Sequence, residues 1–148
     1  MEVVDFKKLI WEYTRKVVES MGSLFGPVSE GHGLTMLQTR IIMELHQYGS
    51  HSVGSLADST CVAGANISAM CKKLEGQGLV ERVRNKEDER VVWVALTKLG
   101  KDTAMEIDRS LNDRISQCLS EEDEEALEHM IKGLEKLNEL LQRMNNNK

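Results

Sequence analysis

The stretch from Ile67 to Gly100 constrains the fold most, because a helical pattern, a glycine-rich stop and two strand-like runs follow one another there. Four apolar residues recur at three- and four-residue steps, which places them on one face of a helix and predicts that this face is buried. They are Ile67, Met70, Cys71 and Leu74. Gly76 and Gly78 then favour a helix end, since glycine takes the left-handed conformation without a steric penalty.

The opposite face of this helix combines small, polar and cationic side chains, a surface that can approach a DNA duplex closely. Its residues are Ala65, Asn66, Ser68, Ala69, Lys72 and Lys73. Small side chains permit entry into a groove, and the lysines can contact phosphates. Asn66 and Ser68 suit base edges or phosphates, although solvation of the helix surface would explain them equally well.

Two short runs rich in β-branched residues follow the helix, Leu79–Arg84 and Val91–Leu96. The strongly polar segment Asn85–Arg90 separates them, so the pattern predicts a two-stranded hairpin with an exposed six-residue tip. Strand alternation places Val92 and Val94 on the same face, and at least one face of the hairpin is expected to pack against helices.

Together these residues resemble the winged helix–turn–helix signature of the MarR transcriptional regulators. The resemblance is carried by Leu74-Glu75-x-x-Gly78-Leu79-Val80-x-Arg82 and by Asp88-x-Arg90-x-x-x-Val94-x-Leu96-Thr97-x-x-Gly100. It implies that the helix before the hairpin reads the major groove of double-stranded DNA. It also implies that Arg90 is the wing arginine, which enters the minor groove, and that Asp88 supports it. Arg84 and Lys86 flank the wing and are expected to contact the DNA backbone.

Two positions depart from the family pattern. Many members have a second arginine beside the wing arginine, where this chain has Glu89, and an arginine on the outward face of the recognition helix, where it has Ala69. The segment Lys72–Arg90 contains six basic and five acidic residues. We therefore expect a modest and strongly salt-dependent DNA affinity, because phosphate contacts dominate such binding.

Further helices are predicted on both sides of this stretch. Apolar spacing from Phe6 to Leu24 predicts a long first helix, and Gly22–Gly33 is predicted to be a loop. Thr35 with Gln38 forms a capping-box pattern that opens a second helix, and Ser52 can cap a short third helix.

The C-terminal part is predicted to be helical as well. Thr97 can cap one helix, and Ser120 with Asp123 can open another. The apolar stripe from Leu127 to Met144 is too long for a compact core of 148 residues to cover. We therefore expect a homodimer in which the first helix and the last two pack against their copies. Two recognition helices would then meet major grooves about 34 Å apart, on a pseudo-palindromic operator.

The predicted fold class is mainly α with a small β-hairpin: a winged helix–turn–helix domain plus a terminal-helix dimerisation region. We predict a single MarR-like domain over residues 1–148, which is enough chain for one core. Residues 35–100 form the winged helix–turn–helix, and residues 1–34 and 101–148 form the dimerisation helices.

Composition limits the cellular setting and the partners. The net charge of −5 argues against a general polyanion binder and favours specific binding. No apolar run is long enough to span a membrane, and Glu2 and Asp5 replace the apolar core of a signal peptide. We therefore expect a cytoplasmic protein without a membrane partner. The three cysteines are too widely spaced for a disulfide framework.

Enzymatic chemistry is not indicated. The sequence contains no nucleophile–base pair, phosphate-binding loop or close metal-ligand spacing, so we predict no enzyme, no cofactor and no metal site. The family resemblance implies a small-molecule crevice near the first two helices, where Tyr13, Met36, Arg40 and Met43 lie. Core packing would also explain these residues, but an arginine beside apolar and aromatic groups suits an aromatic or phenolic ligand with a carboxylate.

The predicted function is therefore a sequence-specific, ligand-responsive, homodimeric repressor. Two alternatives stay open. The first is a winged-helix protein-interaction module with weak DNA affinity, suggested by Glu89 and Ala69. The second is a thiol-responsive regulator acting through Cys61, which lies in the predicted turn of the helix–turn–helix.

Overall fold

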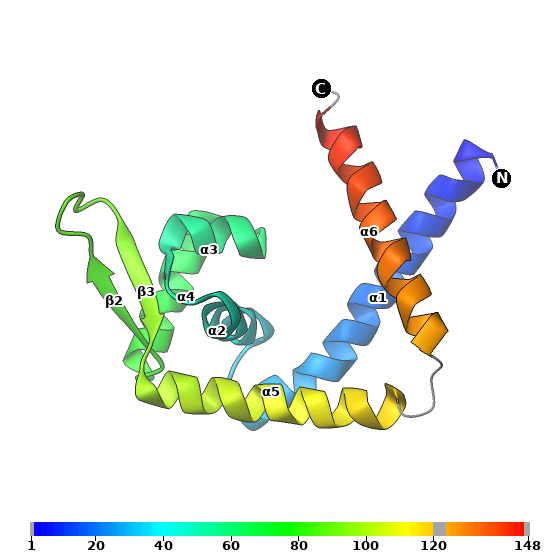
Figure 1. The fold of residues 1–148 in the computed structure, drawn as a ribbon. Helices are drawn as coiled ribbons and strands as arrows, with labels where there is room; N and C mark the ends of the chain where they lie inside the picture. The colour runs from blue at the N-terminus through cyan, green and yellow to red at the C-terminus, as the bar shows by residue number, and fades with distance from the viewer. Residues whose placement is uncertain (1, 120–123, 147–148) are drawn as a thin grey trace. The chain divides into compact units, whose positions relative to one another are not determined.

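The computed structural model describes residues 2–119 and 124–146 and is mainly helical (Figure 1). The chain divides into two compact units, Met1–Leu111 and Asn112–Lys148. In chain order the elements are α1 (Val3–Gly31), α2 (Met36–Tyr48), β1 (His51–Ser52), α3 (Val53–Thr60), α4 (Gly64–Gly76), β2 (Val80–Arg84), β3 (Val92–Leu96), α5 (Lys98–Leu119) and α6 (Glu124–Asn146). The predicted fold class, mainly α with a small β-hairpin, is confirmed, while the dimerisation role of the terminal helices stays a prediction. None of the helices in the described ranges is both long and apolar enough to cross a membrane.

The small sheet has three strands in the order β1-β3-β2, so the prediction of a two-stranded hairpin was incomplete. The predicted pair is present, and its register runs from Val80↔Leu96 to Arg84↔Val92. The additional strand β1 pairs antiparallel with β3 through His51↔Val94. Two residues are too few to show a strand alternation in a sequence, which is why this pattern did not reveal β1.

The predicted loop Gly22–Gly33 is wrong, because α1 continues as a helix to Gly31 and includes Pro27. This stretch has tertiary contacts that compensate for its poor helix formers. Val28 is buried in the core, and Leu24 and Phe25 pack against it. The buried Thr39 hydroxyl of α2 donates a hydrogen bond to the Ser29 hydroxyl of α1 over 2.8 Å.

The core of the first unit lies between α2, α3, α4, the start of α5 and one face of the sheet. Its fully buried side chains include Ile41, Ile42, Leu56, Ile67, Leu74, Val94 and Ile107. The predicted inner face of α4 is confirmed, since Ile67, Cys71 and Leu74 are fully buried and Met70 packs against them. The inner face of α4 therefore fixes which of its residues face the solvent.

The predicted helix caps at Thr35 and Ser52 are confirmed by hydrogen bonds. At the start of α2, the Gln38 amide donates to Thr35 Oγ1 over 3.2 Å, and the Thr35 amide donates to Gln38 Oε1 over 2.9 Å. Ser52 Oγ accepts from the Ser55 amide at the start of α3. These bonds satisfy first-turn amides that have no partner within a helix.

The start of α5 is bound by hydrogen bonds to the two residues that precede β2. Thr97 Oγ1 accepts from the Gly100 amide over 3.0 Å and donates to the Gly78 carbonyl over 2.6 Å. The Thr97 amide donates to the Leu79 carbonyl. Gly78 has a φ of +75°, and a Cβ on Gly100 would lie 1.9 Å from the Leu79 carbonyl oxygen. Only glycine fits at position 100 with this backbone.

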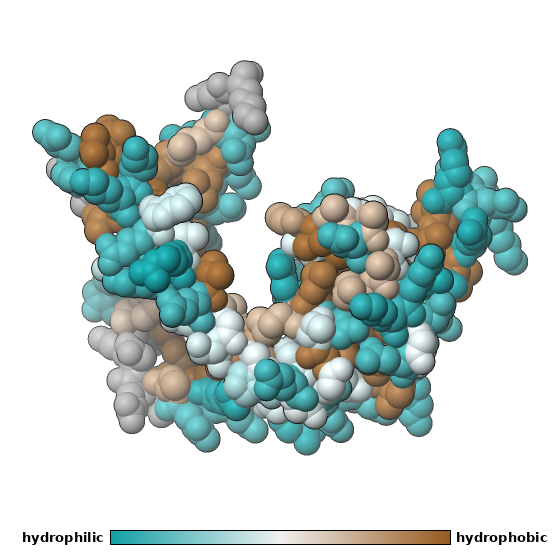
Figure 2. All heavy atoms as spheres, turned by 180° about the vertical axis from the view of Figure 1, so that it is seen from behind, coloured by the Kyte–Doolittle hydropathy of each residue, from teal (hydrophilic) through white to brown (hydrophobic). Residues whose placement is uncertain are grey.

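The second unit contains the end of α5 and α6. None of the described residues of α6 is buried. Its exposed large apolar side chains are Met130, Ile131, Leu134, Leu141 and Met144. Figure 2 shows apolar side chains at the surface of the protein, interspersed with hydrophilic ones. The predicted capping pair Ser120 and Asp123 lies outside the described residues.

Candidate nucleic-acid interface

The outward face of α4 carries the small, polar and basic residues that the sequence places on a potential DNA-contact surface. Asn66, Ala69, Lys72 and Lys73 are exposed, and Ser68 is half-buried. They share this face because the core side chains occupy the opposite one. Ala65 and Ala69 are exposed, and their small side chains let another molecule approach the helix closely.

The turn between α3 and α4 sets the direction of α4. Cys61 has a left-handed backbone with φ of 55°, and the Val62 amide donates to the Ala57 carbonyl. From α2, Arg40 Nη2 donates to the Thr60 carbonyl over 3.1 Å. The side chain of Arg40 therefore braces the last carbonyl of α3, a contact between distant segments that the sequence alone did not reveal.

The tip between β2 and β3 presents Arg90 to the solvent, with 91% of its side chain exposed. Asp88 holds this arginine, since Asp88 Oδ1 accepts from both the backbone amide and Nε of Arg90 over 3.1 Å. Asn85 Oδ1 accepts from the Glu87 amide and shapes the same turn. The structure thus brings Asp88 and Arg90 together, in the arrangement that the family resemblance implies.

The other cations of the hairpin differ in their surroundings. Lys86 is exposed at the tip. Arg84 is exposed, and its Nη1 donates to the Glu89 carbonyl over 3.3 Å, which helps to close the tip. Figure 1 shows the β2–β3 turn extending away from the helices, so these side chains can meet a partner together with Arg90.

Arg82 was counted among the basic residues of this region, but it is bound to Glu75 at the end of α4. Its Nη2 and Nε donate to Glu75 Oε1 over 3.0 and 3.2 Å, and its backbone amide donates to Glu75 Oε2. The side-chain hydrogen bonds from Arg82 hold the pKa of Glu75 below its usual value. By accepting from the Arg82 amide, Glu75 also gives a hydrogen-bond partner to one of the outward amides of the edge strand β2. Arg82 is thus a positioning residue that fastens α4 to the wing.

This pair predicts a pH-dependent contribution to stability. Because the pKa of Glu75 is lowered in the folded state, the contribution exists above its unfolded value and is lost as the pH falls. Glu75→Gln should therefore lower the melting temperature at pH 7, and the difference from the wild type should shrink as the pH falls below about 4.5. Thermal unfolding of both proteins across this range measures the effect.

Glu81→Gln is the matched control for this prediction. Glu81 is an exposed glutamate on the adjacent position of β2, and no ion pair of its side chain is recorded in residues 2–119 and 124–146. This variant should melt close to the wild type at pH 7. A Glu75→Gln deficit that stays constant from pH 7 to pH 3 would contradict the role assigned to the Glu75–Arg82 pair.

A second feature near this surface is a cavity of about 210 Å³ between α1, α2 and α3. It is lined by Phe25, Met36, Thr39, Arg40, Met43, Glu44, Gln47, Ser59 and Thr60. Three of the four predicted ligand-contact residues, Met36, Arg40 and Met43, therefore line one cavity. Tyr13 does not line it and lies on an exposed part of α1. Phe25 supplies an aromatic ring instead, from the stretch that was wrongly predicted to be a loop.

Cys71 and Cys61 offer little reactive chemistry in this structure. Burial raises the pKa of the Cys71 thiol, which disfavours its reactive thiolate form. Cys61 is exposed, and its thiol donates to the Asp58 carbonyl over 3.8 Å. No arginine, lysine or histidine contact that would activate Cys61 is recorded in the described ranges.

Comparison with known proteins gives one family. The transcriptional regulator SarA/Rot family matches residues 23–107, which is more than half of the chain. The HTH-type transcriptional regulator FarR of Neisseria gonorrhoeae is 28% identical over 126 residues, which cover 83% of this chain and 86% of the relative. The homoprotocatechuate degradative operon repressor of Escherichia coli is 31% identical over 83 residues, which are 56% of each protein. The chain thus spans little more than half of that repressor.

Solved structures agree with this family. NadR in complex with 4-hydroxyphenylacetate is 25% identical, with a TM-score of 0.75 over 86% of this chain and 91% of that one. A MarR family protein from Bacillus stearothermophilus has a TM-score of 0.79 over 96% of this chain and 99% of that one. Its identity of 18% shows a shared fold only.

Proposed function

Because this chain belongs to the SarA/Rot family of transcriptional regulators and shares its fold with a MarR family protein, we propose that it is a homodimeric repressor of a pseudo-palindromic operator. We also propose that a small aromatic ligand releases it from DNA. The observation that carries the DNA-binding part is the exposed Arg90, held by Asp88 at the wing tip beside an exposed face of α4 that is small and basic.

The proposed DNA contacts divide by chemistry. Arg90 enters the minor groove with Asp88 orienting its guanidinium, and Lys72 and Lys73 contact phosphates. Arg84 and Lys86 contact the backbone beside the wing. Within α4, Asn66 and Ser68 meet base edges or phosphates, and the small Ala69 allows close approach. The full proposed set is Asn66, Ser68, Ala69, Lys72, Lys73, Arg84, Lys86, Asp88 and Arg90.

The proposed dimer is supported by apolar side chains that the single chain leaves in solvent. Trp11 of α1 is 80% exposed and Leu134 of α6 is 66% exposed. Burying such residues against a second copy would remove a large apolar area from water, as stable homodimer interfaces do. We assign residues 1–34 and 101–148 to this interface and residues 35–100 to DNA binding.

The proposed ligand site is the cavity that contains Arg40. Its guanidinium can bind a carboxylate, and Phe25, Met36 and Met43 provide an apolar surface for a ring. The solved NadR complex contains 4-hydroxyphenylacetate, which supports an aromatic acid as the class of ligand. In the proposed dimer, the spacing between the two DNA-binding regions decides whether both fit the operator. A ligand that binds more tightly to a dimer with the wrong spacing would weaken operator affinity, and the size of the loss equals that difference in binding.

A DNA-binding titration tests this function. The probes are the DNA upstream of the protein's own coding region, a scrambled duplex and a duplex with one half-site, all at physiological salt. We expect binding to the upstream DNA only, with two protein chains per site, and release by 4-hydroxyphenylacetate. Sedimentation equilibrium should show a dimer. A stable monomer, or equal affinity for scrambled DNA, would overturn the proposal.

A protein-interaction module with weak DNA affinity is the second candidate. It is favoured by one observation: Arg82 is bound to Glu75, so fewer cations are available to phosphates than the sequence suggests. The same titration separates the two functions, because this candidate requires affinities for operator and scrambled DNA that are both weak.

A further inference from the structure

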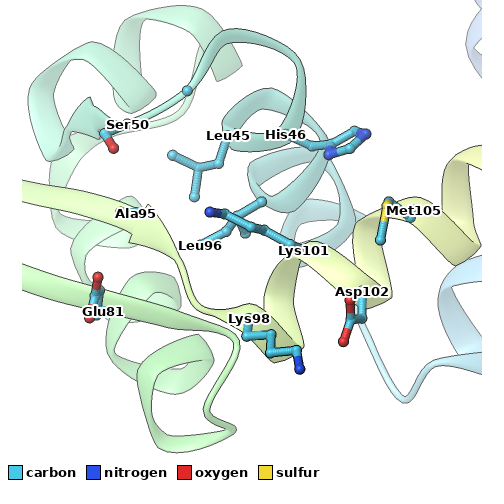
Figure 3. Close-up of a pocket in the computed structure, with 11 residues that line it drawn as sticks. Leu45, His46, Ser50, Glu81, Ala95, Leu96, Lys98, Lys101, Asp102 and Met105 are labelled. Carbon is cyan, nitrogen blue, oxygen red and sulfur yellow. The ribbon is translucent and has the colours of Figure 1, made fainter.

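A cavity of about 590 Å³ lies where the end of α2, the sheet and the first turns of α5 meet (Figure 3). All its lining residues belong to the first unit. Its volume exceeds the 210 Å³ of the cavity beside Arg40 and falls within the range of roughly 300–1,000 Å³ that holds drug-sized molecules. None of the proposed DNA contacts lines it, so this cavity needs its own explanation.

The floor of this cavity is apolar. Leu45 from α2 and Leu96 from β3 are 3% and 9% exposed, so they belong to the core and present only an edge to the cavity. Ala95 and the half-exposed Met105 extend this apolar surface. The unbranched methionine side chain adapts to different shapes, so the floor suits an apolar group without a fixed outline.

A lysine ammonium stands over the apolar floor. In Figure 3 the side chain of Lys101 extends from α5 toward Leu45 and Leu96. No ion pair of Lys101 is recorded in the part of the chain that the structure describes. The positive end of the α5 helix dipole lies at the same end of the cavity. Among the described residues the ammonium of Lys101 therefore has no recorded ion-pair partner, and a ligand anion would provide one.

Two carboxylates also line the cavity and limit where an anion can lie. Asp102 lies one turn after Lys98 on α5, a spacing at which opposite charges partly compensate, and no ion pair between them is recorded among the described residues. Glu81 lies on β2, so its carboxylate reaches the cavity from a different element than Lys101 does. An anion is thus favoured beside Lys101, between the start of α5 and the apolar floor.

We propose that this cavity binds a small carboxylate with an apolar body, for which 4-phenylbutyrate is the probe. Its carboxylate binds the ammonium of Lys101, and its apolar body covers Leu45, Leu96 and Met105. This site is distinct from the proposed Arg40 site, because the two cavities share no lining residue. Binding here requires neither DNA nor the proposed repressor function.

Methionine methyl groups provide a separate reporter for each cavity. Met105 lines the proposed site, whereas Met36 and Met43 line the Arg40 cavity. The full-length protein, labelled with ¹³C at the methyl groups of its eight methionines, is titrated with 4-phenylbutyrate and, separately, with the neutral 4-phenyl-1-butanol. A Met105→Leu spectrum assigns the reporter signal. We expect a saturable shift of Met105 with the acid and a much weaker response to the alcohol.

Variants of single cations test the role of Lys101. Lys101→Ala should weaken the affinity reported by Met105 about fivefold or more, while Lys101→Arg should retain most of it. Lys86 lies outside the cavity, at the wing tip, so Lys86→Ala should leave the ligand affinity reported by Met105 unchanged. Arg40→Ala should also leave the Met105 response intact. An unshifted Met105, an equal response to the alcohol, or an unchanged affinity of Lys101→Ala would each overturn the proposal.

Discussion

Gly100→Ala is expected to destabilise the protein by about 3 kcal/mol or more, because the added methyl group has no place to go. The new Cβ would lie 1.9 Å from the Leu79 carbonyl oxygen, an atom of the backbone that cannot rotate away. The start of α5 must then move off β2 and weaken the hydrogen bonds of Thr97 to Gly78 and Leu79. Thermal or urea unfolding measures the loss, which corresponds to roughly 10 °C in melting temperature.

Gly76→Ala is the matched control for this substitution. Gly76 is also helical, at the end of α4, and a Cβ added there meets nothing within 4 Å. This variant should be neutral or more stable by up to about 1 kcal/mol, since alanine favours a helix over glycine. Similar melting temperatures for the two variants would show that the contact with Leu79 relaxes easily and that the lock between α5 and β2 is weak.

Arg90→Ala is expected to weaken operator binding about tenfold to a hundredfold at constant salt, without lowering the melting temperature. The guanidinium is almost fully exposed and its recorded partner is Asp88, so removing it costs the fold little. Because a minor-groove arginine reads groove width and sequence, the loss should be larger for the operator than for scrambled DNA. Fluorescence anisotropy with labelled duplexes measures both affinities.

Lys73→Ala serves as the comparison for Arg90→Ala. Lys73 is exposed on α4 and is proposed to contact a phosphate. Its removal should weaken binding to operator and scrambled DNA alike, and it should reduce the slope of log affinity against log salt by about one. If Arg90→Ala leaves operator affinity unchanged, or behaves like Lys73→Ala on both duplexes, the minor-groove assignment of Arg90 is wrong.

Local patterns account for the parts of the fold that could be predicted from the sequence. The spacing of Ile67, Cys71 and Leu74 identifies the buried face of α4 because a helix repeats within four residues. The capping pair of Thr35 and Gln38 is also local, since its partners are three residues apart. In both cases, the feature is determined by residues within one or two helical turns of each other.

The missed features depend on contacts between distant segments. The stretch around Pro27 reads as a loop by composition, and only the burial of Val28 against other elements explains its helix. Strand β1 becomes visible through its pairing with Val94, more than 40 residues later. Periodicity within a segment does not report such pairings.

In the candidate site too, contacts between sequence neighbours could be predicted and contacts between distant residues could not. Asp88 and Arg90 are two residues apart, so the family signature alone identifies their partnership. The contact of Arg40 with the Thr60 carbonyl joins residues twenty positions apart, and the pair of Arg82 with Glu75 joins two elements. Both contacts show that arginines can brace the protein, whereas the sequence presents them only as potential ligand or DNA contacts.

The bonds of Glu75 with Arg82 and of Thr97 with Gly78 have a mechanical consequence. They connect α4, the wing and the start of α5 through side-chain hydrogen bonds. A signal that tilts α5 should therefore swing α4 and the wing together and leave the shape of each unchanged. In the proposed dimer, a ligand would then change the distance between the two DNA-binding regions without changing the shape of either one.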